Sequence, residues 1–351
     1  MDQLKKNSSN NFENTILISA GDESGVGPEI ILKALASNQI PEKVKIRVVG
    51  SKKNLINTYK SLKLIGIKNI ANPDELDIED IEVSKLKNAS WKANCGNSSF
   101  IYLKEAIKIT QSKQNTALVT APICKKSWEL AGHNYSGQTE LLAESCNTKN
   151  VGMLFTAKSP ITGWRFNTLL ATTHIPLSEI SKNIINSKKL IISKLNLLSA
   201  FSKQFNNQPT LRVAGLNPHA GEEGILGSEE KDFIEKSLQV WRKNNPDIRL
   251  EGPISPDSCW ISSLKAWNEK KSDGHDGILA MYHDQGLIPM KIIAFNYSVN
   301  TTIGLPIIRT SPDHGTGFDI FNKGIAQCQS ILEAIKTANE LCTKSRLLNT
   351  H

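Results

Sequence analysis

Three of the seven histidines directly follow short apolar runs, and this shared position is the strongest chemical signal in the sequence. They are His174 after 168–172, His219 after 212–216 and His283 after 277–281. If the runs are parallel strands, the histidines meet at the carboxyl edge of one sheet, where ligands bind in α/β proteins. Three nitrogen ligands and an open position suit a catalytic divalent metal. The alternative, that each histidine only hydrogen-bonds a local turn, stays open at this point.

A second polar group lies between residues 291 and 317 and could hold an anion. The segment 300–311 is interpreted as a loop whose backbone amides, together with Arg309, can bind a negatively charged group. Lys291 lies in the apolar run 289–294, which we interpret as a strand, and a buried lysine is costly without an anionic partner. The alternative is an edge lysine that reaches water through its long stem.

The first glycine-rich segment, GDESGVGPE at 21–29, does not match either common phosphate-binding fingerprint. It lacks the GK[ST] of a P-loop, and Ile30 occupies the place of the last glycine of GxGxxG. Asp22, Glu23 and Glu29 would also repel a phosphate. We therefore interpret the segment as a structural turn that enters a helix at Pro28, with the alternative that Asp22 lines a cleft.

Short apolar runs alternate with longer amphipathic stretches along the whole chain. The expected strands are 16–20, 44–49, 117–120, 151–155, 168–172, 212–216, 277–281 and 289–294. Helical spacing appears in 184–205, in 234–241 and in 331–342. This alternation predicts an α/β fold with mostly parallel sheets.

Composition excludes several classes of protein. The chain has 351 residues, 39% hydrophobic and 22% charged, which is a globular balance. Its net charge of +8 is spread without a run of five basic residues, so a nucleic-acid-binding protein is a weak alternative. No stretch approaches the roughly 20 apolar residues of a membrane helix. Six scattered cysteines without a signal peptide indicate reduced thiols and a cytoplasmic location. Residues 1–14 are interpreted as a disordered tail.

Seven segments, in order, resemble the 4-hydroxythreonine-4-phosphate dehydrogenase family of vitamin B6 biosynthesis. They are GDESGVGPEI (21–30), VTAPICK (119–125), GQTELLAE (137–144), TTHIP (172–176), GLNPHAGE (215–222), AMYHDQG (280–286) and VNTTIGLPIIRTSPDHGTGFD (299–319). The resemblance runs from about Ile16 to about Ala338.

The resemblance implies a homodimeric, two-domain enzyme similar to isocitrate and isopropylmalate dehydrogenases, with the active site in the interdomain cleft. The expected domains are 15–130 with 300–351, and 131–299. It implies NAD or NADP as cofactor and one divalent metal, zinc, cobalt or magnesium, on His174, His219 and His283, with the third ligand supplied by the partner subunit. Substrate contacts carried over by motif are Gln138, Thr139, Lys291, Asn300 and Arg309, and the cofactor contacts are Gly315 and Thr316.

The implied reaction is oxidation of 4-phosphooxy-L-threonine to 2-amino-3-oxo-4-phosphooxybutanoate, which decarboxylates to 3-amino-2-oxopropyl phosphate during pyridoxal 5'-phosphate biosynthesis. Asp284 and Asp257 are the candidates for the general base. A related dehydrogenase of 4-phosphothreonate or 4-phosphoerythronate is the alternative.

The sequence departs from the family pattern in three segments. Gln138 replaces a usual His, Cys124 a usual Asn, and Glu23-Ser24 a usual Pro-Ala. Because glutamine cannot carry a positive charge, the first change puts fine substrate specificity in question and adds some weight to the alternative substrates.

Overall fold

The computed structural model describes residues 14–187, 189–270 and 274–349, and it divides into two compact units. The first unit comprises residues 1–135 and 315–351, and the second comprises residues 136–314. The predicted tail 1–14 lies outside the described residues except for Asn14, which begins the first strand. The chain leaves the first unit once and returns to it once.

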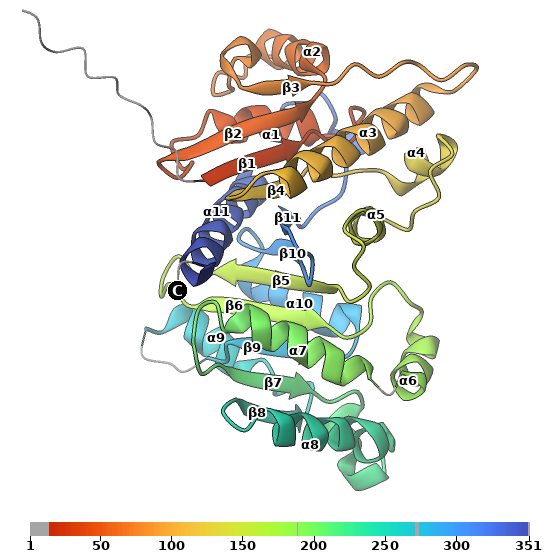
Figure 1. Ribbon diagram of the computed structural model, residues 1–351, viewed down its shortest axis with the longest axis vertical. Helices are drawn as coiled ribbons and strands as arrows, with labels where there is room; N and C mark the ends of the chain where they lie inside the picture. The colour runs from red at the N-terminus through yellow and green to blue at the C-terminus, as the bar shows by residue number, and fades with distance from the viewer. Residues whose placement is uncertain (1–13, 188, 271–273, 350–351) are drawn as a thin grey trace, which may run out of the picture. The chain divides into compact units, whose positions relative to one another are not determined.

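The first unit is built on four parallel strands in the order β3-β2-β1-β4 (Figure 1). They are β1 (Asn14–Ser19), β2 (Val44–Gly50), β3 (Ile78–Asp80) and β4 (Thr116–Thr120). The helices are α1 (Gly27–Leu35), α2 (Lys52–Leu64), α3 (Trp91–Ser112), α4 (Lys125–Leu130) and α11 (Gln329–Asn349), with short 3₁₀ turns at Pro73–Glu75 and Phe318–Ile320. β4 is buried along its whole length, as expected of a parallel strand covered on both faces.

Local sequence explains where these helices begin. The hydroxyl of Ser51 accepts a hydrogen bond from Asn54 N at 3.1 Å, and that of Ser90 accepts one from Ala93 N at 3.1 Å. Each serine caps a free N–H group in the first turn of α2 or α3. Pro28 lies in the first turn of α1, as predicted.

The second unit contains a mixed sheet in the order β11-β10-β5-β6-β9-β7-β8. Its strands are β5 (Gly152–Lys158), β6 (Arg165–Leu170), β7 (Thr210–Ala214), β8 (Arg249–Ile254), β9 (Gly277–Ala280), β10 (Val299–Ile303) and β11 (Ile308–Pro312). β6, β9, β7 and β8 are parallel neighbours, whereas β11, β10, β5 and β6 pair antiparallel. The α/β fold with mostly parallel strands is therefore confirmed.

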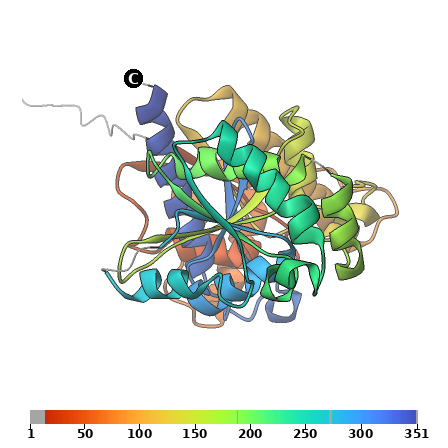
Figure 2. The ribbon, with the colours of Figure 1, turned by 90° about the horizontal axis from the view of Figure 1, so that it is seen from below.

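Helices cover both faces of this sheet (Figure 2). The helices of this unit are α5 (Gln138–Ser145), α6 (Leu177–Asn186), α7 (Leu190–Ser202), α8 (Glu235–Asn244), α9 (Ile261–Asn268) and α10 (His283–Ala294), with a 3₁₀ segment at Pro218–Gly224 and a π-helical turn at Glu230–Ile234. α7 and α8 lie on one face, and α9 and α10 on the other. The core under α9 and α10 contains Phe155, Phe166, Leu170, Trp267, Ile278 and Met290.

Three sequence-based expectations about local structure were wrong. The run 289–294 is the end of helix α10, in which Met290 and Ala294 are buried four residues apart while Ile292 is exposed. The segment 300–311 is a hairpin of β10 and β11. The helical pattern 184–205 divides into α6 and α7, and Phe205 lies beyond α7. A short apolar run does not reveal its period, which explains the first error.

The domain borders also differ from those expected. The hairpin β10–β11 pairs with β5 through residues 299–303, which keeps it in the second unit. The chain accordingly returns to the first unit after residue 314. Within the described part of the chain, no helix is long and apolar enough to cross a membrane.

Replacing Phe166 by alanine should lower the free energy of unfolding by about 3–5 kcal/mol, because this ring is fully buried and its loss leaves a cavity. Urea-induced unfolding followed by fluorescence measures the change. Ile161→Ala is the matched control: its side chain is 53% exposed, so we expect a loss below about 1 kcal/mol. Equal losses in the two variants would contradict this assignment of the core.

Candidate functional site

The three predicted metal-binding histidines follow three neighbouring parallel strands of the second unit. β6 pairs with β9, and β9 pairs with β7. His174 follows β6, His219 follows β7, and His283 begins the helix after β9. Parallel alignment thus brings all three to the carboxyl edge of the same part of the sheet, the edge at which α/β proteins bind ligands.

Two of these histidines are close together within one chain. The ring centroids of His174 and His283 lie 5.5 Å apart with an interplanar angle of 41°. Among the described residues of a single chain, no group of three His, Cys, Asp or Glu side chains is arranged to hold a metal. The expectation that the partner subunit supplies a ligand remains a prediction.

The backbone at His174 and His219 is strained. His174 has φ of 39°, and the residues from His219 to Glu223 all have positive φ, between 43° and 82°. Only one of these five, Gly221, is a glycine. The left-handed conformation costs an ordinary residue about 1–2 kcal/mol, so the fold must hold this turn in place. Such strain is concentrated at functional sites.

The orientation of His283 is set by its neighbour. Asp284 Oδ1 lies 2.7 Å from His283 Nδ1. A carboxylate can only accept, so Nδ1 carries the proton, and the free electron pair of the imidazole is then on Nε2. Asp284 therefore prepares this ring as a ligand through Nε2.

Asp257 has a different environment. The hydroxyl of Ser255 donates to Asp257 Oδ1 at 2.6 Å. This hydrogen bond lowers the pKa of Asp257, and the nearby His219 lowers the pKa further. A carboxylate whose pKa is lowered is a weaker base, which argues against Asp257 as the group that removes the proton.

Two of the predicted substrate residues bind each other. Arg309 is only 3% exposed; its Nη2 donates to Gln138 Oε1 at 2.9 Å and its Nη1 donates to Thr302 Oγ1 at 3.0 Å. Burial lowers the pKa of Arg309 to about 10, so the guanidinium is still charged at neutral pH. Gln138 begins α5, followed by Thr139, and thus links this helix to β11.

The remaining substrate candidates are on α10 and β10. Lys291 Nζ donates to the backbone oxygen of Asp313 at 2.8 Å and forms an ion pair with Asp313 Oδ2 at 2.8 Å. The anionic partner that a lysine in an apolar run requires is therefore present in the chain. Asn300, on β10, lies opposite Ser311 of β11 in the hairpin.

The predicted cofactor residues Gly315 and Thr316 lie in the first unit, and Thr316 contacts the turn after β1. Thr316 O accepts a hydrogen bond from Val26 N at 2.8 Å. A Cβ built on Gly25 would lie 2.6 Å from the same oxygen, so this close approach requires glycine. Asp22 is fully buried, and its Oδ1 accepts a hydrogen bond from Ser24 N at 2.9 Å within the turn.

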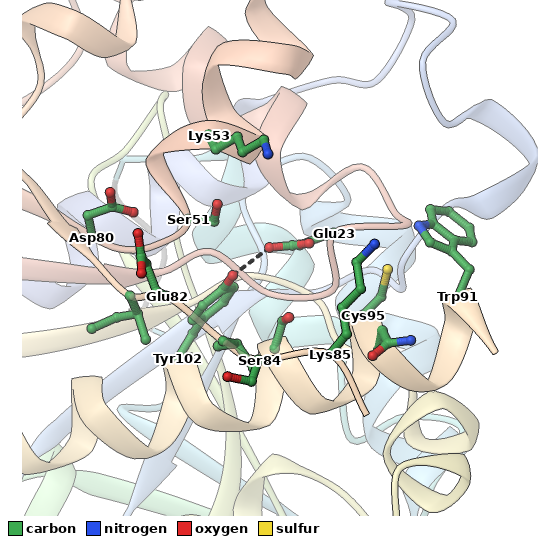
Figure 3. A pocket seen from close by; sticks show the side chains of 14 residues that line it. Glu23, Ser51, Lys53, Asp80, Glu82, Ser84, Lys85, Trp91, Cys95 and Tyr102 are labelled. Atoms are coloured by element: carbon green, nitrogen blue, oxygen red, sulfur yellow. Dashed lines mark hydrogen bonds between the residues drawn. The ribbon is translucent and has the colours of Figure 1, made fainter. Parts of the chain in front are cut away.

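A cavity of about 580 Å³ opens beside the same turn, beyond the ends of β1, β2 and β3 (Figure 3). Its lining is mostly polar and includes Glu23, Ser51, Lys53, Glu82, Lys85, Trp91 and Tyr102. The hydroxyl of Tyr102 donates to Glu23. Burial raises the pKa of Glu23. Sequence reasoning missed this cavity because β3 has only three residues and gave no strand signal.

The structure accounts for two of the three departures from the family pattern. Gln138 accepts the Arg309 hydrogen bond, and Glu23 is the partner of Tyr102. Nothing in the structure explains Cys124, which precedes α4.

Taken together, the two units define an α/β enzyme with a histidine group at the carboxyl edge of one sheet and a polar cavity at the carboxyl edge of the other. Residues 42–338 match the family model described as pyridoxal phosphate biosynthetic protein PdxA. The chain therefore belongs to the PdxA family, which confirms the resemblance seen in its motifs.

Known relatives agree with this assignment. A Synechococcus sp. (strain RCC307) protein named 4-hydroxythreonine-4-phosphate dehydrogenase is 46% identical over 93% of this chain and 99% of its own length. A Synechocystis sp. protein of the same name is 44% identical over 93% and 95%. The crystal structure of the Klebsiella pneumoniae 4-hydroxythreonine-4-phosphate dehydrogenase matches with a TM-score of 0.75 and 30% identity, over 94% of this chain and 99% of that one.

Replacing Gln138 by leucine should lower the free energy of unfolding by about 1–3 kcal/mol, because the buried Nη2 of Arg309 loses this acceptor. Denaturant unfolding measures the effect. Gln208→Leu, at an exposed position of the same unit, is the control and should change the stability by less than about 0.5 kcal/mol. An unchanged midpoint for Gln138→Leu would show that Arg309 does not depend on this contact.

Proposed function

We propose that this protein is an NAD- or NADP-dependent, metal-assisted dehydrogenase that oxidises 4-phosphooxy-L-threonine. The product, 2-amino-3-oxo-4-phosphooxybutanoate, loses carbon dioxide to give 3-amino-2-oxopropyl phosphate for pyridoxal 5'-phosphate synthesis. The observation that carries the proposal is the group of three histidines after β6, β7 and β9, in a chain whose relatives have this activity in their names.

The donor set suits a divalent metal. His174, His219 and His283 would hold it, and imidazole nitrogen favours zinc or cobalt over magnesium. The hydrogen bond that His283 Nδ1 donates to Asp284 leaves Nε2 of His283 available for this purpose. When bound, the metal supplies positive charge that stabilises negative charge developing on a substrate oxygen. We assign Asp284 the role of orienting His283.

The nicotinamide cofactor fits the first unit. Thr316, which follows Gly315, contacts the turn after β1, and the cavity lined by Glu23 begins at the same turn. We assign the cofactor to this region. Lysines 53 and 85 can contact phosphate oxygens, and the carboxyl groups of Glu23 and Glu82 can accept hydrogen bonds from ribose hydroxyls (Figure 3). The cofactor accepts the hydride that leaves the substrate carbon.

The anionic ends of the substrate require positive charge. Arg309 is held by Gln138 and Thr302 and provides a fixed guanidinium. The backbone N–H groups at the start of α5, at Gln138 and Thr139, add the partial positive charge of a helix N-terminus. Lys291 provides a second positive charge, and Asn300 provides a side-chain amide that can hydrogen-bond to the substrate. These residues bind and orient the substrate so that the alcohol that loses its proton and hydride is held in one position.

The exposed surface of α10 supports a homodimer with a shared active site. Ile288, Ile292 and Phe295 are 58%, 77% and 67% exposed and recur at helical spacing on the helix that begins with His283. Burial of this apolar stripe against a second copy would stabilise a dimer and place that copy beside the histidines.

Purified protein supplied with NAD, Co²⁺ and 4-phosphooxy-L-threonine should produce NADH, followed at 340 nm. The same assay with 4-phosphothreonate tests the alternative substrate, which has a hydroxyl in place of the amino group. We expect a higher kcat/KM for the amino acid. A higher value for 4-phosphothreonate would assign the chain to the alternative activity, and no turnover with either substrate would exclude both.

His219→Ala should weaken Co²⁺ binding at least tenfold and lower turnover by a similar or larger factor, because one of three proposed nitrogen ligands is lost. Isothermal titration calorimetry measures the affinity. His133→Ala, which removes a histidine from the first unit, is the matched control and should leave Co²⁺ affinity unchanged. Full metal affinity in His219→Ala would exclude the proposed ligand set.

A further inference from the structure

The loop that carries His219 is wrapped around one buried acidic side chain, Glu230. This side chain is only 4% exposed. Its Oε1 accepts hydrogen bonds from Leu216 N at 2.6 Å and Asn217 N at 2.7 Å, and its Oε2 accepts one from Asn217 Nδ2 at 2.9 Å. Both oxygens are therefore bonded to the segment that immediately precedes His219.

The same carboxyl group fills the inside of the left-handed turn. A Cβ built on Gly221 would lie 2.7 Å from Glu230 Oε2, and one built on Gly215 would lie 3.3 Å from Oε1. The loop thus closes on Glu230 from both sides of His219. A turn in which four non-glycine residues have positive φ needs such an external constraint, since its own backbone disfavours it.

Hydrogen bonds also join this loop to the other two histidine loops. Asn217 Nδ2 donates to Glu229 Oε2 at 2.8 Å, and Glu229 Oε1 accepts from Ser181 on α6, the helix after His174. Gln285, two residues after His283, donates from Nε2 to Gly215 O at 2.7 Å. Thr172 Oγ1 donates to Met281 O at 2.7 Å and joins the loops of His174 and His283.

We propose that Glu230 is the positioning residue of the metal site: it holds the left-handed turn and thereby places the imidazole of His219. The proposal rests on the proposed function, since it takes His219 as a metal ligand. Glu230 itself does not bind the metal in this proposal. It acts through three hydrogen bonds and through the shape it gives to the loop.

Glu230→Gln is the sharpest test, because it keeps the size of the side chain and replaces one acceptor oxygen by an N–H donor. The new amide can satisfy the two backbone N–H groups or Asn217 Nδ2, but not all three. Glu230→Ala removes every acceptor and should have the larger effect. Asp232→Asn is the matched control, an acid-to-amide change at an exposed position in the same π-helical turn.

The full-length protein is titrated with Co²⁺, and both the affinity and the visible absorption spectrum of the bound ion are recorded. For Glu230→Gln we expect affinity to fall about tenfold to a hundredfold and the spectrum to change, since ligand geometry changes. Circular dichroism and the melting temperature establish that the variant is folded. Asp232→Asn should bind Co²⁺ like the parent protein.

His219→Ala, titrated in parallel, distinguishes a failure of the role proposed for Glu230 from a failure of the proposed metal site. If His219→Ala loses Co²⁺ affinity while Glu230→Gln keeps the parent affinity and spectrum, the role of Glu230 is overturned and the metal assignment stands. If His219→Ala keeps full affinity, both are overturned. A folded Glu230→Gln protein with weaker binding and an altered spectrum supports the role of Glu230.

Discussion

The parallel alignment of β6, β9 and β7 is the constraint on which the histidine group depends. Strands that run in the same direction end at the same edge, so residues far apart in the chain become neighbours without any local sequence relation. Strand alignment alone fixes only where each loop begins. The hydrogen bonds of Thr172, Asn217 and Gln285 then join the three loops to one another, so that each histidine is placed by the loop beside it as well as by its own strand.

The fold and the location of the histidines could be predicted from sequence because both depend on short-range patterns. Buried parallel strands are nearly continuous apolar runs, and a histidine after such a run lies at the ligand-binding edge. The end of α10 was mistaken for a strand because Pro289 and its apolar neighbours conceal the helical period. The hairpin of β10 and β11 was mistaken for a loop because its residues are mainly polar, and strand pairing with β5 is a long-range property.

The parts of the site that sequence could not reveal depend on contacts between distant segments. Glu230 is one of several acidic residues near the start of α8, and only its hydrogen bonds to Leu216 and Asn217 distinguish it. Likewise, the replacement of the family histidine by Gln138 suggested altered substrate contacts, whereas the structure shows an acceptor for Arg309. In both cases the residue type was known, but the partner was not.

The ion pair between Lys291 and Asp313 has a consequence for selectivity. Because Asp313 already neutralises Lys291, an incoming anion meets almost no net attraction at this point until it displaces the resident carboxylate. A doubly charged phosphate competes with a single carboxylate better than a singly charged group does. If Lys291 binds the substrate as we propose, the pair would favour a doubly charged phosphate over weakly charged metabolites, through competition with Asp313 and without any steric barrier.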